Sequence, residues 1–529
     1  MNYSGDQIAP GAKIINPNSD PKIKNLLERF GKAVTRRRNW EDRWQDCYDY
    51  SLLQREGFYG ETEGEDRTDR IFDETAVVGV QEFASRMQSG FCPAFMRWVK
   101  FDAGPGVPID QRENIAKGLE EIEADFFDVI NHSNFNQEIY EALLEIAVGT
   151  AAILVEENDE PDRPARFTAV PLTQIWLEKD PFDGIGAVFY APKMRAGDLL
   201  IKWPKAKINN SELSQAIDRE PEKEVEVVCV TYRDWSIRSE EVNRLCVIVK
   251  QYEDLIYEEE FRGEGSNPWI VGRWSKSAGE VYGRGPLLNA MPAIKTLNLT
   301  HQLILENAEL AISGMWQGDD DGVLNPDTVR LVPGTVIPKA PGSSGLQPLE
   351  TPGRFDVGDM IIEKMQHNVR KALYNETLGP REGTPPSATE VSERMADLAR
   401  QIGSPFGRIM SEIIEPMVRR VLYIRRKQGA IKIPRIGGRY ITIRPTAALA
   451  KAQRFDDINN ERYFYQTIGE LYGPEMVALV SKPEEVAARF AELYQVSKNP
   501  LRSKIEIKQI MQKLQQAAQQ MAGTEQKPT

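Results

Sequence analysis

The sequence is poor in the residues that most often bind metals or form redox centres. Its 529 residues include four cysteines and three histidines. No two cysteines have Cys-x-x-Cys spacing, so reduced thiols are favoured over disulfides or a metal site. The histidines, at positions 132, 301 and 367, are far apart in sequence, which argues against a zinc site. We therefore expect no metal and no cofactor.

Long apolar runs are missing as well. No stretch reaches the length of about 18 apolar residues that would predict a membrane-spanning helix. Residues 1–6 lack the basic and apolar regions of a signal peptide. The composition, with 41% hydrophobic and 27% charged residues, is that of an ordinary folded protein. These absences predict a protein that stays in the cytoplasm where it is made and has no membrane partner.

The common catalytic motifs are not present either. The sequence has no Gly-x-x-x-x-Gly-Lys-Ser/Thr phosphate-binding loop, no Gly-x-Ser-x-Gly and no His-Glu-x-x-His. Three adjacent acids, Asp319, Asp320 and Asp321, could bind a divalent cation, but consecutive residues in a turn rarely converge on one ion. An exposed acidic turn is the favoured interpretation, and His367 is favoured as an ordinary helical residue. We expect no catalytic residue and no enzymatic activity.

The excess of acidic residues limits the kind of nucleic-acid contact. The formal net charge is −13. Proteins that hold nucleic acid over a whole surface do so with Lys and Arg, which neutralise phosphates. The charge argues against such binding, but it is compatible with a protein past which nucleic acid slides. The basic tract at 36–38 is interpreted as a solvated helix face rather than a phosphate contact.

Two long helical segments dominate the pattern of the chain, at about 284–316 and 356–378. Between them, residues 317–355 are rich in Gly, Pro and Asp and contain short β-prone runs. The first helix carries apolar residues on more sides than one partner helix would cover, so it needs neighbours on several sides. Copies of the chain arranged in a ring would supply them. Burial within the core of a single subunit is the alternative.

The remaining pattern predicts an α+β fold in which helices predominate. Short β-type runs between residues 151 and 261, among them 185–190 and 225–232, predict a mostly antiparallel sheet. Helical spacing predicts further helices over 26–52 and 111–147, and another that is capped by Asp73. A long helix is expected from a capping box at 387–390 to Gly429, with bends at Gly403 and Pro405 and at Pro416. Gly283 and Gly285 are interpreted as a flexible joint before the first long helix. We therefore treat Gly283, Gly285, Gly403 and Pro405 as candidate hinges.

Three groups of residues, in this order and spacing, resemble the head-to-tail connector, or portal protein, of short-tailed bacteriophages. They are Arg70-Ile71-Phe72-Asp73-Glu74-Thr75-Ala76, Val281-Tyr282-Gly283-Arg284-Gly285-Pro286 followed by Ile294-Lys295-Thr296-Leu297-Asn298, and Ser387-Ala388-Thr389-Glu390-Val391-x-Glu393-Arg394-Met395 leading to Gly407-Arg408. The resemblance covers about residues 36–429. Beyond it, the C-terminal helices match the family only in character.

The resemblance implies a portal fold that assembles as a ring, typically of twelve copies, around a central channel. Such a fold has a wing, a stem, a clip and a crown. By position, the wing would comprise 1–281 and 387–445, the stem 282–316 and 356–378, the clip 317–355, the tunnel loop 379–386, the helical crown 446–522 and a disordered tail 523–529.

The family's role implies a virion protein at one capsid vertex that is assembled in the host cytoplasm. There it would nucleate head assembly and form the conduit for DNA packaging and ejection. The implied partners are further copies of the chain, the packaging terminase large subunit, the tail adaptor, and the capsid and scaffold proteins. Double-stranded DNA would pass through the channel without sequence-specific recognition.

The same resemblance, together with charge, selects candidate contact residues. For the DNA channel they are Arg381, Glu382 and Gly383 of the tunnel loop and, on the second long helix, Lys364, Arg370 and Lys371. For docking at the clip they are Asp319, Asp320, Asp321 and Arg330. Two other classes of protein remain open: another structural virion component, such as a scaffold or tail adaptor, and a DNA-processing enzyme with an unrecognised site.

Overall fold

The computed structural model divides the chain into two compact units. The first consists of residues 1–386 and 401–444, and the second of residues 387–400 and 445–529. The structure describes residues 20–60, 64, 67–104, 109–158, 160, 162–313, 316–317, 341–342, 347–348, 355–375, 401–432, 441–446, 455–473 and 486. Of the elements below, α13 (Phe455–Tyr472) lies in the second unit, β13 (Ile441–Pro445) ends one residue beyond the first unit, and all others belong to the first.

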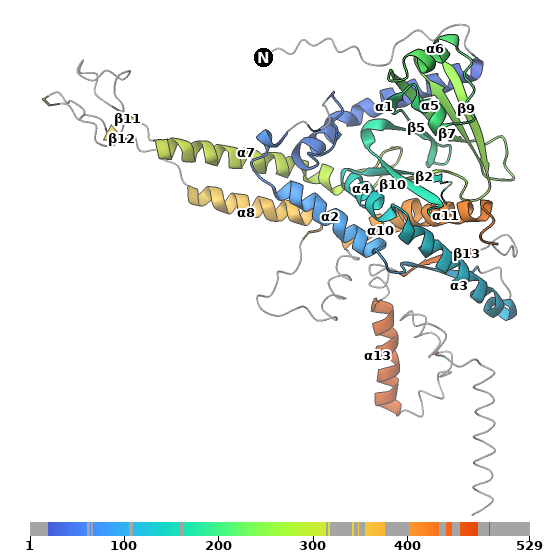
Figure 1. Cartoon of the computed structure of the whole chain (residues 1–529). Coiled ribbons are helices and arrows are strands. Elements are labelled where there is room, and N and C mark those ends of the chain that lie inside the picture. The colour runs from blue at the N-terminus through green and yellow to red at the C-terminus, as the bar shows by residue number, and fades with distance from the viewer. Residues whose placement is uncertain are drawn as a thin grey trace, which may run out of the picture. The chain divides into compact units, whose positions relative to one another are not determined.

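Four helices open the first unit (Figure 1). They are α1 (Pro21–Ser51), α2 (Thr75–Phe91), α3 (Ile109–His132) and α4 (Phe135–Val148). The Asp20 side chain accepts the N–H of Lys22, and Pro21 occupies the first turn, where no hydrogen bond is lost. The helices expected from periodicity are therefore present, and the one predicted over 111–147 is two helices separated at Ser133 and Asn134.

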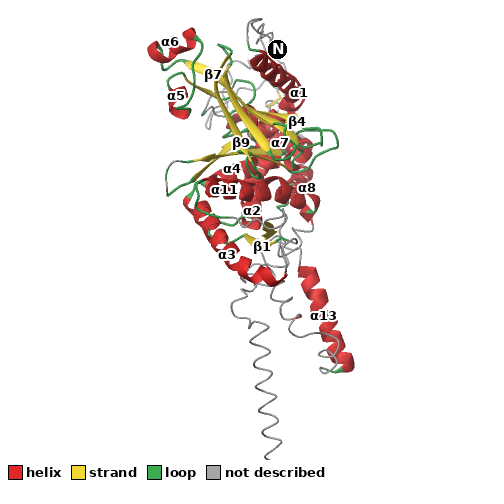
Figure 2. Cartoon of the chain, turned by 90° about the vertical axis from the view of Figure 1, so that its right-hand side faces the viewer, coloured by secondary structure: helices red, strands yellow, loops and turns green. Residues whose placement is uncertain are grey.

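Two antiparallel sheets of three and six strands form most of the β part of this unit (Figure 2). The three-stranded sheet has the order β10-β2-β3, and the six-stranded sheet has the order β4-β5-β7-β8-β9, with β6 paired to β7. Their bounds are β2 Thr150–Glu157, β3 Ala165–Val170, β4 Ile175–Lys179, β5 Ile185–Tyr190, β6 Lys193–Arg195, β7 Glu224–Arg233, β8 Val242–Val249, β9 Asp254–Arg262 and β10 Trp269–Arg273. The predicted α+β class with antiparallel sheet is confirmed.

Helices cover both faces of the six-stranded sheet. Val228 and Val230 of β7 pack with Leu26 and Phe30 of α1. Val225, Val227 and Cys229 alternate with them and face α5 (Asp198–Lys202) and α6 (Ser211–Arg219). Because side chains alternate along a strand, a strand buried on both faces reads as a continuous apolar run.

The helical segment after residue 400 is interrupted where the sequence predicts bends. Gly403, at φ 42°, precedes α10 (Ser404–Ile409), in which Pro405 lies in the first turn. A π-helical turn, η3 (Met410–Ile414), separates α10 from α11 (Glu415–Lys427). The wider turn accommodates Pro416, whose missing N–H would otherwise interrupt a continuous α-helix. Residues 387–400, the start of the long helix that we predicted, lie outside the described residues.

The two long helices predicted from periodicity are α7 (Pro286–Ser313) and α8 (Phe355–Ala372), and they lie side by side (Figure 1). Just beyond α7, β11 (Trp316–Gln317) pairs with β12 (Gln347–Pro348). The β-prone runs expected at 329–332 and 335–337 lie outside the described residues. The remaining short elements are η1 (Thr68–Arg70), η2 (Leu172–Gln174), and the pair of strands β1 (Val99–Ala103) and β13 (Ile441–Pro445).

Candidate functional site

The candidate site is the α7–α8 pair, because this pair exposes apolar surface along its outer half. The first half of α7 is buried in the body through Leu287, Met291, Ile294 and Leu297. Further along the same helix, large apolar side chains are about half exposed: Leu299 by 54%, Leu303 by 49% and Leu305 by 55%. Ile361 on α8 is also exposed. The pair therefore projects apolar surface that the described residues of one subunit leave uncovered, as expected for a contact with another chain.

Leu299 and Leu303 lie four residues apart and share one face of α7, whereas Leu305 lies on another. The apolar surface therefore does not form a single stripe. It agrees with the expectation that α7 contacts neighbours on more than one side.

The segment that leads into α7 packs closely against the backbone that joins α4 to β2. The N–H of Gly285 donates to the carbonyl of Val148 over 2.9 Å, and that of Gly283 donates to Thr150 Oγ1 over 2.8 Å. A Cβ at Gly285 would lie 2.0 Å from the carbonyl oxygen of Ala147, so a larger residue does not fit. This close approach gives a reason for glycine that does not require motion at the predicted joint.

A polar cluster fixes α7 and α8 to the start of α2. Asp73 is buried, and its two carboxylate oxygens accept the N–H of Thr75 at 3.0 Å and the amide of Gln366 from α8 at 2.8 Å. From α7, Asn298 accepts the N–H of Phe72 at 2.7 Å and donates to the carbonyl of Arg70 at 2.8 Å. We call Asp73, Asn298 and Gln366 the stem anchor. The stem anchor thus links the start of α2, α7 and α8 by hydrogen bonds at one place.

No sequence pattern pointed to this cluster. Asp73 was expected to cap α2, and it does accept an N–H from the first turn of that helix. Asn298 and Gln366 lie more than 200 residues from it in sequence and are polar residues on otherwise apolar helical patterns. Only the fold brings them to Asp73.

The end of α8 is fixed on α2 as well. Asn375 donates from its side-chain amide to the carbonyl of Gly79 over 2.6 Å, and Arg86 donates to the carbonyl of Tyr374 over 3.0 Å. Tyr374 has a φ of 58°, which is a costly conformation for a side chain of its size. The described chain thus leaves α8 at a well-defined point, immediately before the predicted tunnel loop.

The candidate channel residues fall into two groups. Lys364, Arg370 and Lys371 are exposed on α8, and the last two lie in its final turn, where cations favour the helix dipole. Arg381, Glu382 and Gly383 lie outside the described residues, as do the clip candidates Asp319, Asp320, Asp321 and Arg330. For these residues the sequence-based roles stay predictions.

One cation of the 36–38 tract has a structural role. Arg37 is buried, and its NH1 donates to three carbonyl oxygens, of Leu172, Thr173 and Ile175, at 2.7–3.0 Å. Its Nε donates to Glu41 at 2.7 Å, and the guanidinium lies 3.9 Å from the centre of the Trp176 ring. Burial lowers the pKa of Arg37, and these contacts compensate for the loss of water. Arg36 and Arg38 are exposed.

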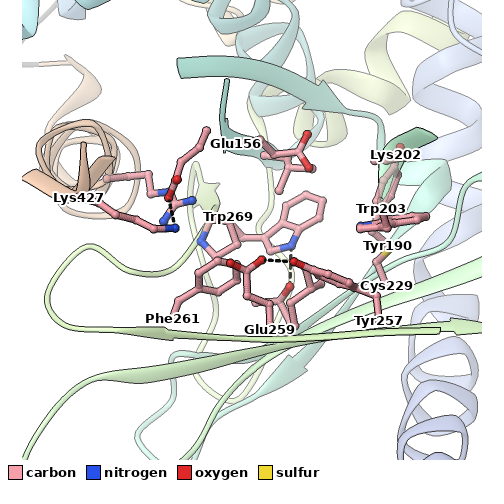
Figure 3. A pocket seen from close by; sticks show the side chains of 16 residues that line it. Glu156, Tyr190, Lys202, Trp203, Cys229, Tyr257, Glu259, Phe261, Trp269 and Lys427 are labelled. Atoms are coloured by element: carbon pink, nitrogen blue, oxygen red, sulfur yellow. Dashed lines mark hydrogen bonds and ion pairs between the residues drawn. The ribbon is translucent and has the colours of Figure 1, made fainter. Parts of the chain in front are cut away.

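The body also contains a cavity of about 210 Å³ between the two sheets, α5 and α11 (Figure 3). Tyr190, Trp203 and Trp269 are among its walls. Its polar groups are largely paired, since Lys427 contacts Glu157 at 2.9 Å, Tyr257 donates to Glu259 at 2.7 Å, and Trp269 donates to Thr231 at 3.2 Å. Burial raises the pKa of the Cys229 thiol to about 12, so it stays protonated. This chemistry is that of packing rather than of nucleophilic catalysis.

The described ranges contain no group of three or more His, Cys, Asp or Glu side chains arranged for a metal ion. Within those same ranges, no helix combines the length and the apolar character of a membrane span.

Apolar surface on a firmly anchored helix pair indicates a structural protein that assembles with other chains. The model of the bacteriophage head to tail connecting protein family matches residues 23–501, and the chain belongs to that family. It is a family of structural proteins of the phage particle, not of enzymes. The resemblance found from the sequence is therefore confirmed.

A curated relative is similar along most of its length. The probable portal protein of Bordetella phage BPP-1 is 22% identical over 485 residues, which is 86% of this chain and 84% of that protein. Solved structures with a similar chain include the virion of a native gene transfer agent particle, at 12% identity and a TM-score of 0.35, covering 82% of this chain and 98% of the other. Another is the neck of the native particle computed with C12 symmetry, at 12% identity and a TM-score of 0.34, covering 78% and 92%.

Proposed function

We propose that this chain is a portal protein that forms a ring of about twelve copies at one capsid vertex, around a channel for DNA packaging and ejection. The observation that carries the proposal is the exposed apolar surface of α7 and α8, with Leu299, Leu303 and Leu305 about half in water. Monomeric proteins seldom expose leucines grouped in this way. Side-by-side copies in a closed ring would cover surfaces on both sides of each helix pair.

The anchoring of the pair supports a mechanical role. The stem anchor ties both helices to the start of α2, and the Asn375 contact ties the end of α8 to α2 at a second point. A helix pair that lines a channel under load needs such fixed ends. In this proposal α7 and α8 are the stem, residues 317–355 the clip, the remainder of the first unit mostly the wing, and residues 446–522 the crown.

The charge supports a conduit rather than a DNA-binding protein. A net charge of −13 on each copy gives a ring that repels the phosphate backbone as a whole. Strong, salt-dependent attachment through about six to ten phosphates would hold the DNA in place, which a conduit must avoid. We propose that a few cations make the local contacts, namely Arg381 in the tunnel loop first and Lys364, Arg370 and Lys371 on α8 second.

The proposed partners follow from the family. The clip would dock the packaging terminase large subunit and afterwards the tail adaptor, with Asp319, Asp320, Asp321 and Arg330 as contact candidates. The capsid and scaffold proteins would contact the ring while the head assembles in the host cytoplasm.

Electron microscopy of the purified full-length chain tests the ring directly. We expect closed rings with a central hole in negative-stain images, and no hydrolysis of ATP or DNA in assays with a panel of divalent metals. Monomers or irregular aggregates across a range of concentrations would contradict the ring. Robust turnover by the chain alone would favour an enzyme instead.

A further inference from the structure

Side chains close the outer edge of β4 in the six-stranded sheet. The outermost strands of this sheet are β4 and β9, and each has backbone groups that point away from its neighbour and need other partners. On β4, the carbonyl of Ile175 accepts from Arg37 Nη1 at 2.9 Å. The N–H of Leu177 donates to the Tyr282 hydroxyl at 3.0 Å. The β4 edge is therefore not available to another strand at these positions.

The outer strand β3 of the three-stranded sheet is closed in the same way. Asn134 accepts the N–H of Phe167 at 3.0 Å and donates to the carbonyl of the same residue at 2.7 Å. Glu138 accepts the N–H of Ala169 at 2.7 Å. Contacts of this kind stop an outer strand from pairing with another chain.

On β9, the backbone groups of Glu258 and Glu260 point away from the sheet. In an antiparallel pair, residues whose backbone groups bond across the pair alternate with residues whose groups point outward. The N–H of Gly263 donates to the carbonyl of Glu241 at 2.8 Å, in the register that pairs β8 with β9. Because Glu258 and Glu260 lie an odd number of residues before Gly263, their N–H and C=O groups face the outer side.

This part of the β9 edge lacks a partner in the described part of the chain. Toward the start of β9, Lys207 covers the edge, because its N–H donates to the carbonyl of Ile256 at 2.7 Å. From Glu258 to Arg262, no described residue forms a hydrogen bond with an outward-facing backbone group. We call residues 258–262 of β9 the open edge. Unlike β3 and β4, β9 can accept a further strand there.

The helix α1 begins next to the open edge. Lys22, in the first turn of α1, forms an ion pair with Glu258 at 2.5 Å. From there α1 crosses the sheet to β4, where the rings of Phe30 and Trp176 have centres 5.2 Å apart. Figure 1 shows the start of α1 on the β9 side of the sheet. Residues 1–19, which lie outside the described part of the chain, are therefore joined to it beside the open edge.

The sequence of residues 1–19 contains a short segment suited to a strand. Residues 12–16, Ala-Lys-Ile-Ile-Asn, include two β-branched side chains and no proline, and they lie between Gly11 and Pro17. The linking residues 17–20 span up to about 14 Å when extended, enough to bring the end of the segment back to the edge beside Lys22. A short tether also gives the segment an effective concentration of the order of millimolar at this edge.

We propose that residues 12–16 pair with the open edge of β9 in the same copy, as a short antiparallel strand. This orientation places Asn16 beside Glu258, where α1 begins, and Ala12 beside Arg262. A parallel strand would instead end at Arg262, away from the start of α1. The added strand gives the outward backbone groups of β9 a partner and prevents edge-to-edge pairing between copies. The proposal does not depend on a ring, so it can fail while the proposed function stands.

Amide hydrogen exchange of the full-length chain tests the pairing. Ile14→Pro should speed exchange of the N–H groups of Glu258 and Glu260 by about tenfold or more, because proline lacks a donor and disrupts the middle of the added strand. The N–H of Phe261, which faces β8, should exchange at an unchanged rate. Ile8→Pro is the matched control, since it lies outside residues 12–16, and it should leave all three rates unchanged. Equal rates in the two proline variants would contradict the pairing.

A disulfide distinguishes pairing within one copy from pairing between copies. The four native cysteines are buried and give little background. Under mild oxidation, the double variant Ile14→Cys, Glu260→Cys should form a disulfide within one chain, because residues directly opposite on antiparallel strands have Cα atoms about 5.5 Å apart. A denaturing gel without reductant should then show a faster-migrating monomer. The matched control, Ile8→Cys, Glu260→Cys, should remain largely reduced.

Three outcomes would overturn the inference. Covalent dimers or a ladder from the Ile14 variant would assign the open edge to residues 12–16 of another copy. Equal disulfide formation in the Ile8 control would show that the tether alone brings the thiols together, without a strand. Neither a disulfide nor a change in exchange would leave the open edge to a different chain.

Discussion

At the scale of single residues, neighbouring arginines of this protein differ in role, because one is buried and stabilises the fold while the others are exposed to solvent. Arg36, Arg37 and Arg38 are identical in sequence character, yet Arg37 is buried against three carbonyl oxygens and Glu41 while its neighbours are in water. Helical periodicity could have suggested this, because Arg37 lies seven residues after Phe30 on the buried face of α1. The sequence pattern did not indicate the acceptors, which lie in η2 and at the start of β4, more than 130 residues away.

Arg37→Ala should therefore destabilise the first unit by about 3 kcal/mol or more, because Glu41 and three carbonyls lose a buried, charged donor. Chemical denaturation followed by tryptophan fluorescence measures this. Arg36→Ala is the matched control and should cost less than about 0.5 kcal/mol. Equal losses in the two variants would mean that the Arg37 contacts contribute little.

A buried carboxyl beneath α1 predicts a pH dependence. Tyr48 donates to both oxygens of Glu145, at 3.0 and 2.8 Å, and Arg55 Nε lies 3.3 Å from one of them. Burial raises the pKa of Glu145 above its usual 4.5, and Arg55 and Tyr48 only partly oppose the rise. The folded state therefore binds this proton more tightly than the unfolded state.

The stability contributed by protonated Glu145 is thus complete below about pH 4.5 and is lost as the pH rises through the raised pKa. Glu145→Gln removes this loss, so the melting temperature of the wild type minus that of the variant should fall as the pH rises from about 4.5 to about 7. Glu82→Gln, at an exposed position on α2, serves as the control. A difference that is constant with pH would contradict the assignment.

At the scale of elements, the sequence predicted those helices and strands whose own residues show a clear apolar pattern. It missed short elements that are stabilised mainly by packing on other parts of the chain. β5 and β7 were predicted nearly to the residue, because their apolar runs reflect burial on both faces. The short helices α5 and α6 were missed, since they have few residues and are stabilised mainly by packing on β7. β10 was missed because it is short and includes Gly272, where a Cβ would lie 2.1 Å from Ile413.

In the candidate site, too, the elements with a clear periodic pattern were predicted and the contacts between distant residues were not. The α7–α8 pair was predicted from its periodicity. The three channel candidates on α8, Lys364, Arg370 and Lys371, are exposed, and their role in the channel stays a prediction. The stem anchor was not predicted, because hydrogen bonds between distant polar residues leave no periodic trace in a sequence.

The outer half of α7 gives a prediction about assembly. Leu303→Asp should shift the protein from rings toward monomers, because it places a charge in the proposed interface. The stability of the monomer should change by less than about 0.5 kcal/mol, since the position is half exposed there. Sedimentation velocity and thermal unfolding measure the two effects. Gln81→Asp adds the same charge at an exposed polar position on α2, outside the α7–α8 pair, and should still assemble.

At the scale of the whole molecule, the surfaces proposed for assembly lie on the first unit. The exposed leucines of α7 belong to residues 1–386 and 401–444. The core clusters that surround the six-stranded sheet belong to the same unit. The second unit, which includes α13, is thus not required by any contact on which the ring proposal depends.

A chain that ends after Thr446, and so keeps β13, should therefore still form rings and should unfold within about 3 °C of the full-length protein. Electron micrographs and calorimetry of the two chains test this directly. Rings from the truncated chain would show that residues 447–529 are not needed for assembly. A truncated chain that folds but stays monomeric would show instead that residues 447–529 drive assembly and that the exposed surfaces of α7 and α8 are not sufficient for it.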